Sequence, residues 1–141
     1  MIVKELMSSR ICFAKPDATA SDAASLMKKY DIGLVPVCDN KGCLLGLVTD
    51  RDLVLRSLTD EKREISKIPL SEIMTSEIAY ATPDMNIHDA ALIFAEKKLR
   101  RLPVLENSRL VGILSLSDLS QKKIFLAEVG DIMGSIAKAA R

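Results

Sequence analysis

An internal duplication limits the folds open to this chain. Shifted by 67 residues, the first half falls on the second, so that Met7 matches Met74. One residue is lost in a turn, and the match continues through Asp52 and Asp118 at an offset of 66. A unit of about 60 residues buries only ~60% of the surface of its unfolded chain. We therefore expect the two halves to share a core rather than fold as independent beads.

Composition narrows the functional classes. The 141 residues are 48% hydrophobic and 4% aromatic, which indicates an aliphatic core. No apolar run approaches the ~20 residues that a bilayer requires, and no signal-like segment begins the chain, so we expect a cytoplasmic protein without a membrane partner. The formal net charge of +1, with acids and bases interspersed, gives little general attraction for nucleic acid, which we do not expect as a partner.

The cysteine pattern favours a reduced compartment. Cys12, Cys38 and Cys43 are odd in number and sit among apolar neighbours, which is typical of core or strand cysteines rather than a disulfide framework. Cys38 and Cys43 flank a turn, so a metal clip is the alternative. His88 is the single histidine, however, and a tetrahedral zinc site lacks further ligands. We predict no metal and take His88 to be exposed and incidental.

The first half predicts the order β-α-β-β-α. Thr19, with Asp22 at the third helical position, has the pattern of a helix cap, and Gly33 is expected to break that helix. Apolar runs around the turn at residues 39–42 predict a hairpin. The predicted elements are a strand at residues 11–14, a helix after Thr19, strands at 34–38 and 44–48, and a helix at 50–58.

The second half repeats this order and is followed by an extension. Its predicted elements are a strand at residues 78–81, a helix at 86–98 capped by Asn86 and Asp89, strands at 102–105 and 110–114, and a helix from Leu116. Beyond residue 126 an apolar stripe indicates a terminal helix after Gly130, packed on its own domain or clamping a dimer. The stripe consists of Ile132, Met133, Ile136, Ala137 and Ala140. We expect domains at 1–64, 65–126 and 127–141.

Three duplicated pieces together resemble the tandem cystathionine-β-synthase-type domain, the CBS domain, which is paired in a Bateman module. They are the lead-ins Val3-Lys4-Glu5-Leu6-Met7 and Leu70-Ser71-Glu72-Ile73-Met74, the runs Leu34-Val35-Pro36-Val37 and Arg101-Leu102-Pro103-Val104, and the two Gly-x-x-Thr/Ser-x-x-Asp segments. The resemblance covers residues 3–126. It implies an α+β fold in which two β-α-β-β-α repeats pack face to face through their sheets.

The same resemblance implies a function. Such modules commonly bind AMP, ADP, ATP or S-adenosylmethionine in two clefts, and they sense these ligands rather than catalyse. We therefore expect a regulatory module that is not an enzyme, requires no cofactor, forms a flat homodimer through its alanine-rich helix faces, and acts on a separate partner protein. A scaffold that has kept the fold and lost the ligand is the alternative. Catalysis ranks third, because no nucleophile-base set, paired acids or metal cluster stands out.

Site residues follow from the resemblance, position by position. Asp52 and Asp118 are expected to bind ribose, and Thr49 and Ser115 to contact ribose or phosphate. Helix-first-turn amides favour phosphate, and a carboxylate accepts bonds from both ribose hydroxyls. Basic residues before the second strand would meet phosphate, and apolar ones would border the bases. These are Arg100 and Arg101 for phosphate, and Ile11, Gly33, Leu34, Val35, Ile78 and Leu102 for the bases.

Simpler explanations exist for the polar residues. Thr-x-x-Asp and Ser-x-x-Asp before a helix are also capping boxes, worth ~1 kcal/mol each without any ligand. Arg100 and Arg101 also suit a solvated helix end. The repeats differ here, because Gly33-Leu34 stands where the second repeat has the two arginines. Family geometry suggests that a ligand crosses the unit boundary, so we expect the arginines to serve the Asp52 cleft and make it the more phosphate-dependent one.

Overall fold

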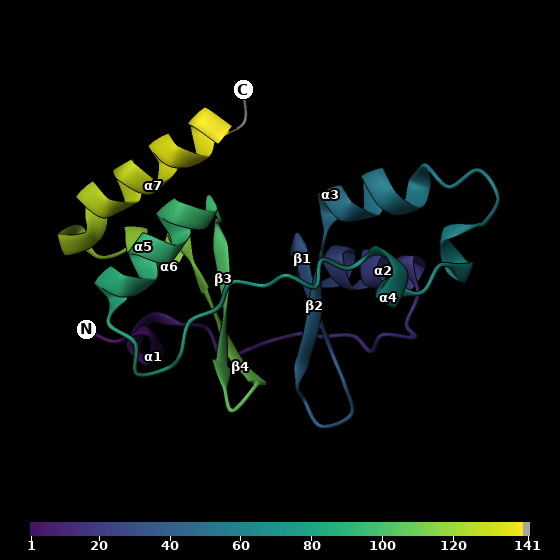
Figure 1. Cartoon of the computed structure of the whole chain (residues 1–141), viewed down its shortest axis with the longest axis horizontal. Coiled ribbons are helices and arrows are strands. Elements are labelled where there is room, and N and C mark those ends of the chain that lie inside the picture. The colour runs from purple at the N-terminus through teal and green to yellow at the C-terminus, as the bar shows by residue number, and fades with distance from the viewer. Residues whose placement is uncertain (140–141) are drawn as a thin grey trace. The chain divides into compact units, whose positions relative to one another are not determined.

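The computed structural model describes residues 1–139, which form two compact units. Unit 1 contains Met1–Ile11 together with the chain from Ala79 onward, and unit 2 contains Cys12–Ile78. Each unit has one two-stranded antiparallel sheet with helices packed on it (Figure 1). The predicted α+β class is confirmed. Face-to-face packing of the repeats stays a prediction.

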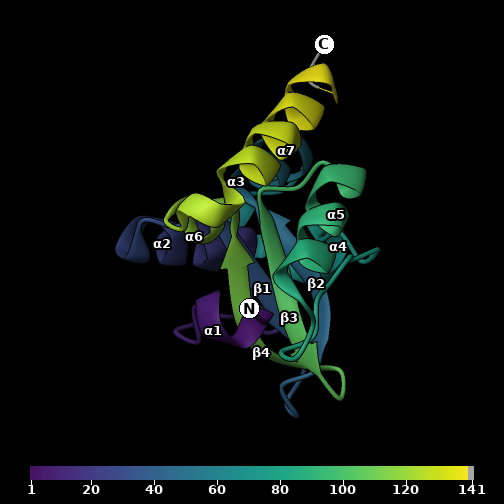
Figure 2. The same ribbon diagram turned by 90° about the vertical axis from the view of Figure 1, so that its left-hand side faces the viewer.

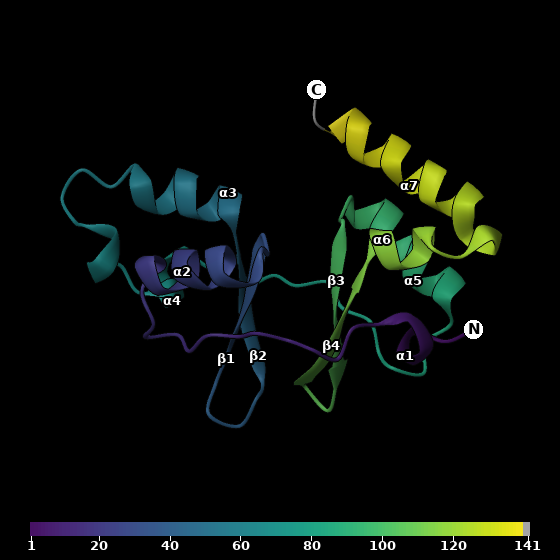
Figure 3. The ribbon, with the colours of Figure 1, turned by 180° about the vertical axis from the view of Figure 1, so that it is seen from behind.

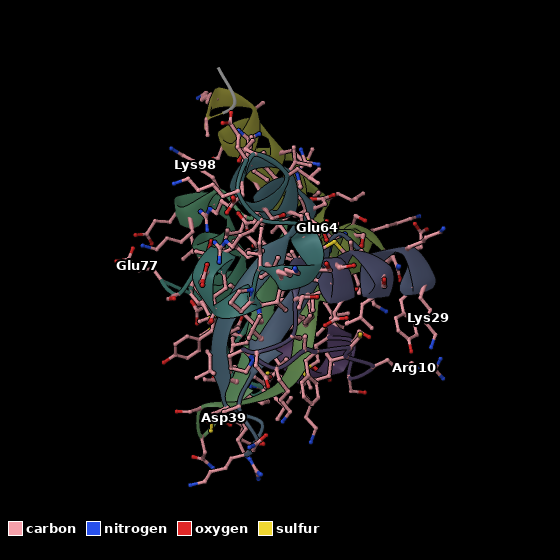
Figure 4. The ribbon with its side chains drawn as sticks, turned by 90° about the vertical axis from the view of Figure 1, so that its right-hand side faces the viewer. Arg10, Lys29, Asp39, Glu64, Glu77 and Lys98 are labelled. Atoms are coloured by element: carbon pink, nitrogen blue, oxygen red, sulfur yellow. The ribbon has the colours of Figure 1, made fainter. Side chains whose placement is uncertain are left out.

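Unit 2 follows the predicted order of its repeat except at the first strand. Its helices α2 and α3 lie beside the hairpin of β1 and β2 (Figure 3). Asp39, labelled in Figure 4, lies in the turn of this hairpin, where its carboxylate accepts hydrogen bonds from two backbone amides. The elements are α2 Ala20–Tyr30, β1 Leu34–Cys38, β2 Leu44–Thr49, α3 Asp50–Leu53, a π-helical turn η1 Val54–Leu58, a 3₁₀ turn η2 Ile65–Lys67, and α4 Leu70–Ile73.

Unit 1 repeats this arrangement and adds one long helix. Helix α1 lies beside β4 (Figure 2), and α7 runs beside α5 and α6 (Figures 1 and 2). The elements are α1 Val3–Leu6, α5 Ile87–Lys97, β3 Arg101–Glu106, β4 Arg109–Ser115, α6 Leu116–Ser120, a 3₁₀ turn η3 Lys123–Phe125, and α7 Leu126–Ala139.

The strand predicted at the start of each repeat is reduced to a single bridge. Ala14 pairs in parallel with Val37, through one bond from its amide to Pro36 O (2.9 Å) and one from the Cys38 amide to its own carbonyl (2.9 Å). The next ladder bonds in either direction would require amide hydrogens on Pro16 and Pro36, which proline lacks. Ala81 repeats this pattern in unit 1, between two prolines at the equivalent positions.

Helix starts are confirmed more closely than helix ends. Thr19 caps α2, with Asp22 as the reciprocal partner, and the Asn86 side chain accepts from the His88 amide at 2.8 Å. Asp89 makes no capping bond within residues 1–139. Helix α2 ends at Tyr30 rather than at Gly33, because Asp31 adopts the left-handed conformation (φ 52°) that closes the helix.

The terminal helix begins earlier than predicted. Gly130 lies inside α7 rather than before it. A glycine costs a helix interior only about 1 kcal/mol, and packing of the apolar face offsets that cost. Of the predicted stripe, Ile132 is buried and Ile136 half-buried, whereas Met133 and Ala137 are exposed. Ala140 lies outside the described residues.

A core shared between the two units stays a prediction, and within each unit the apolar cluster is not built from one repeat alone. Each cluster is completed by a lead-in from the other repeat. Val3 is fully buried among second-repeat side chains, and Leu70 is fully buried among first-repeat side chains. Antiparallel backbone bonds hold each lead-in to a strand, Ser8 with Ile113 in unit 1 and Thr75 with Leu47 in unit 2. Small repeats gain burial by this exchange.

The exchange explains one duplicated glycine in each repeat. A Cβ atom added to Gly46 would lie 2.5 Å from Met74 Sδ, and one added to Gly112 would lie 2.6 Å from Met7 Sδ. Both methionines belong to lead-ins. The lead-in therefore packs directly on a strand backbone that has no side chain at that point.

The cysteines are reduced thiols. Cys38 is buried in β1, and burial raises the pKa of its thiol to about 11, which keeps it neutral near pH 7. Within residues 1–139, no three histidine, cysteine or acidic side chains gather closely enough to hold a metal ion. The helices in the same residues are too short or too polar to span a bilayer.

Candidate nucleotide-binding site

The candidate site of unit 1 begins where β4 ends and α6 starts. Ser115 Oγ accepts a hydrogen bond from the Asp118 amide (3.1 Å), and Asp118 Oδ2 accepts one from the Ser115 amide (2.7 Å). This reciprocal pair is a capping box. It also fixes the Ser115 side chain at the strand end. The predicted cap is therefore present, and a ligand role would be additional to it.

A pocket of ≈ 370 Å³ opens at this strand end, which is within the size range of small-molecule sites. Arg101 lies directly opposite Ser115 in the sheet, and the Leu116 amide donates to Arg100 O at 2.9 Å. Two exposed guanidinium-bearing residues thus border a row of serine hydroxyls. The lining residues are Arg100, Arg101, Ser115, Leu116, Ser117, Ser120, Val129 and Met133.

The serines of this pocket are ordered by hydrogen bonds. The Oγ atoms of Ser115 and Ser117 are 2.8 Å apart, and Ser120 Oγ donates to the Ser117 carbonyl at 2.7 Å. Hydroxyl groups both donate and accept, and guanidinium groups only donate. The polar side of the pocket is therefore suited to an anion with several acceptor oxygens, such as a phosphate.

Unit 2 has the equivalent cap. Thr49 Oγ1 accepts from the Asp52 amide (3.1 Å), and Asp52 Oδ2 accepts from the Thr49 amide (3.0 Å). Leu34 pairs with Thr49 in the sheet, and the Asp50 amide donates to Gly33 O at 3.0 Å. The predicted residues Gly33, Leu34, Thr49 and Asp52 are thus neighbours.

A pocket of ≈ 440 Å³ also lies beside the unit 2 cap, but its chemistry differs. It is lined by Asp50, Arg51, Val54 and Leu55, whose repeat counterparts are Leu116, Ser117, Ser120 and Gln121. The two serines Ser117 and Ser120 of unit 1 are therefore replaced by Arg51 and Val54, and Gln121 is replaced by Leu55. Of these two pockets, the unit 1 pocket is the one that combines several serine hydroxyls with two adjacent arginines.

Arg56 was not predicted, and it engages the unit 2 aspartate. Its Nη2 atom lies 3.7 Å from Asp52 Oδ1, and its Nη1 donates to Ile73 O (2.9 Å) and Thr75 Oγ1 (3.2 Å). The second carboxylate oxygen of Asp52 thus faces a cation within the unit. The i, i+4 spacing of Asp52 and Arg56 was the sequence signal for this contact.

Apart from the four neighbours at the unit 2 cap, the predicted site residues separate into three groups. Arg100, Arg101 and Ser115 line one pocket, whereas Asp118 supports it through the cap. Val35 and Leu102 are fully buried core residues and do not line a pocket described here, so we leave both out of the proposed site. Ile11 and Ile78 are half-buried. Each is the last residue before the chain passes from one unit to the other.

Sequence reasoning missed five pocket residues, Leu116, Ser117, Ser120, Val129 and Met133. The two serines lie on the same short helix as Asp118, which the sequence could show. The sequence did not show that Arg100 and Arg101 line the same pocket as these serines. Val129 and Met133 are one helical turn apart on α7. Their position beside the pocket depends on how α7 packs, which no local pattern specifies.

Comparison with known proteins agrees with this arrangement. The family model of the CBS domain matches residues 3–58 and again 70–123. The chain belongs to the CBS domain family. A CBS domain-containing protein of Bacillus subtilis, YhcV, is 36% identical over 135 residues, which cover 96% of this chain and 94% of YhcV. This CBS-domain pair therefore has a relative of nearly its own length.

Solved structures of tandem CBS pairs are also similar. The CBS domain pair of protein MJ0100, in complex with 5′-methylthioadenosine and S-adenosyl-L-methionine, has a TM-score of 0.75 and 26% identity, covering 86% of this chain and 94% of that chain. CBSX2 in complex with AMP has a TM-score of 0.76 and 27% identity, covering 89% of this chain and 98% of that one. Both of these neighbours bind adenosyl ligands.

Proposed function

We propose that this CBS pair is a regulatory module that binds an adenosyl nucleotide, AMP or a close relative, and acts on a separate partner protein. The observation that carries the proposal is the unit 1 pocket, where Arg100, Arg101 and Ser115 converge. The ligands of the two similar CBS pairs support the adenosyl part. The nucleotide acts as a regulatory ligand, and no reaction is assigned to the site.

In unit 1 we place the ligand phosphate beside Arg100 and Arg101, and the ribose near the capping aspartate Asp118. In unit 2 the ribose of a ligand would lie near Asp52. The phosphate placement differs from the expectation that the arginines serve the Asp52 cleft, because both line a pocket with Ser115 inside unit 1. Unit 2 has Gly33 and Leu34 at the equivalent positions. The unit 1 pocket is then the more phosphate-dependent of the two, and the sites are unequal.

Calorimetry tests the proposal. AMP should bind the wild-type protein with micromolar affinity, about −8 kcal/mol. Arg101→Ala should weaken AMP about tenfold or more and adenosine by less than twofold, because charge-assisted hydrogen bonds reach only the phosphate. Lys97→Ala, which removes an exposed cation outside the pocket, is the matched control and should bind AMP as the wild type does.

Two outcomes would contradict this proposal. If AMP, ADP, ATP and S-adenosylmethionine all give no heat and no thermal shift at millimolar concentration, the ligand-free scaffold becomes the better description. If Arg101→Ala weakens AMP and adenosine equally, or if two indistinguishable sites bind AMP, the assignment of the phosphate to the arginines is wrong.

We also propose a homodimer, but not through the alanine-rich helix faces that the sequence analysis expected. The alanine-rich faces of α2 and α5 are largely buried inside each unit, so they are not available for a dimer contact. The buried alanines are Ala20, Ala23, Ala90 and Ala91. Three large apolar side chains after α3 are instead more than half exposed. These are Val54 (51%), Leu55 (53%) and Leu58 (61%). An exposed apolar group of this kind is typical of an interface.

Light scattering should report about 31 kDa, twice the chain mass of 15.5 kDa. Leu58→Asp should shift the protein toward the monomer, because a charge in an apolar interface remains desolvated and unpaired. Leu92→Asp is the control, since Leu92 is at least as exposed (67%) but lies on α5 of the other unit. A wild-type monomer at high micromolar concentration would refute the dimer.

A further inference from the structure

Helix α7 contributes to the unit 1 pocket although it lies beyond the CBS match. The family model ends at residue 123, and α7 begins at Leu126. Val129 and Met133, one turn apart on this helix, line the same pocket as the two arginines. The pocket thus has a wall that the repeat motif itself does not supply. Unit 2 has no counterpart of this helix among the described residues.

The wall is held in place by contacts away from the pocket. Ile132 is buried (1% exposed) on the face that packs against unit 1, and Phe125, just before the helix, is equally buried. His88 Nδ1 of α5 pairs with Glu128 Oε1, and the His88 and Phe125 rings meet edge to face with centroids 5.4 Å apart. The prediction that His88 is exposed is confirmed, but the prediction that it is incidental is wrong, because it joins α5 to the start of α7. These contacts make the wall part of the folded unit.

The two sides of the pocket differ in chemistry. Arg100, Arg101 and the serine hydroxyls form the polar side, and Val129 and Met133 add the apolar side. Met133 is 42% exposed, so its side chain is only partly covered by the rest of the protein. Methionine sulfur makes favourable contacts with aromatic rings, and an unbranched side chain adapts to a flat partner. Such a pocket is suited to a ligand with an anionic group and a flat apolar group.

We propose that Val129 and Met133 contact the base of the nucleotide whose phosphate lies at Arg100 and Arg101, so that α7 determines specificity for the base. This inference rests on the proposed nucleotide-binding function. Arg100 and Arg101 would then distinguish AMP from adenosine, and Met133 would distinguish AMP from a smaller phosphate ligand that lacks the base.

Titration of Met133→Ala with AMP and with ribose 5-phosphate tests the contact. The variant should weaken AMP about tenfold, because it removes most of the apolar surface facing the base, and should change ribose 5-phosphate binding by less than twofold. Leu126→Ala is the matched control on the same helix, since Leu126 is 52% exposed and does not line the pocket. It should bind both ligands as the wild type does.

Fluorescence supplies an independent readout. The chain contains no tryptophan, so Met133→Trp would carry a single fluorophore at the proposed base site. AMP should quench or shift its emission through stacking of the base on the indole, and Leu126→Trp should report no change at the same AMP concentration. A tryptophan at residue 133 is expected to fold normally, because the native side chain is partly open to solvent.

The outcomes separate this inference from the proposed function. If AMP binds in an Arg101-dependent way, while Met133→Ala keeps wild-type affinity and the residue 133 tryptophan is silent, then α7 does not contact the base and only this inference fails. If no adenosyl ligand binds the wild type, the proposed function and the inference fail together. A loss of ribose 5-phosphate affinity equal to that of AMP would also overturn the inference.

Discussion

Asp118→Asn should lower the affinity for AMP about 10- to 100-fold and leave the unfolding midpoint within a few degrees of the wild type. The cap uses one carboxylate oxygen, Oδ2, which accepts from the Ser115 amide at 2.7 Å. An asparagine side-chain oxygen can accept the same bond, so most of the cap survives. What the substitution removes is the charge and the second acceptor that ribose hydroxyls require. Calorimetry and thermal unfolding of the same samples measure both effects.

Asp22→Asn is the matched control for this prediction. Asp22 forms the same reciprocal box with Thr19 at the start of α2, and Asp22 Oδ2 accepts from the Thr19 amide at 2.9 Å. It lies outside both pockets described for the caps. The control should match Asp118→Asn in stability and the wild type in AMP affinity. Unchanged affinity in Asp118→Asn, with a clear fall in midpoint, would show that Asp118 is only a cap.

Val3→Asp should destabilise unit 1 by about 4 kcal/mol or more, although residue 3 belongs to the first CBS match, at residues 3–58. Val3 is fully buried in the cluster built mainly from second-repeat residues, and its amide donates to Met85 O at 2.8 Å. A carboxylate there would be desolvated with no cation packed against it among the buried cluster members. Native-state hydrogen exchange should show faster exchange first in residues 79–139, rather than in Cys12–Ile78.

Leu70→Asp provides the mirror experiment. Leu70 is the duplicate of Val3, and it is fully buried in the cluster of unit 2, where its amide donates to Ala18 O at 2.8 Å. This variant should lose protection first in Cys12–Ile78. Opposite patterns in the two variants are expected because each lead-in completes the other repeat. If Val3→Asp instead loosened Cys12–Ile78 first, the exchange of lead-ins would be absent in solution.

Much of the fold was predictable from local patterns. The reciprocal spacing of Thr49 with Asp52, and of Ser115 with Asp118, predicts a helix start from hydrogen bonds that span only three residues. The turn at residues 39–42 predicts a hairpin for the same reason, and the duplication transfers each assignment to the second half. Because these features depend on neighbours in the chain, sequence reasoning identified the caps, the hairpins and the family.

Tertiary structure decided the partners of each buried face. The apolar lead-in around Val3 predicts burial but not the repeat that buries it. The hydrophobic effect is non-directional, so an apolar segment gains equally from burial against either repeat. The first strand is reduced to one bridge because Ala14 pairs with Val37, where Pro16 and Pro36 cannot donate the next bonds. The sequence shows both prolines but not this pairing. The position of Met133 beside Arg101 likewise depends on the packing of α7 against α5. Periodicity shows that a helix has an apolar face, and only long-range packing selects the surface that covers it.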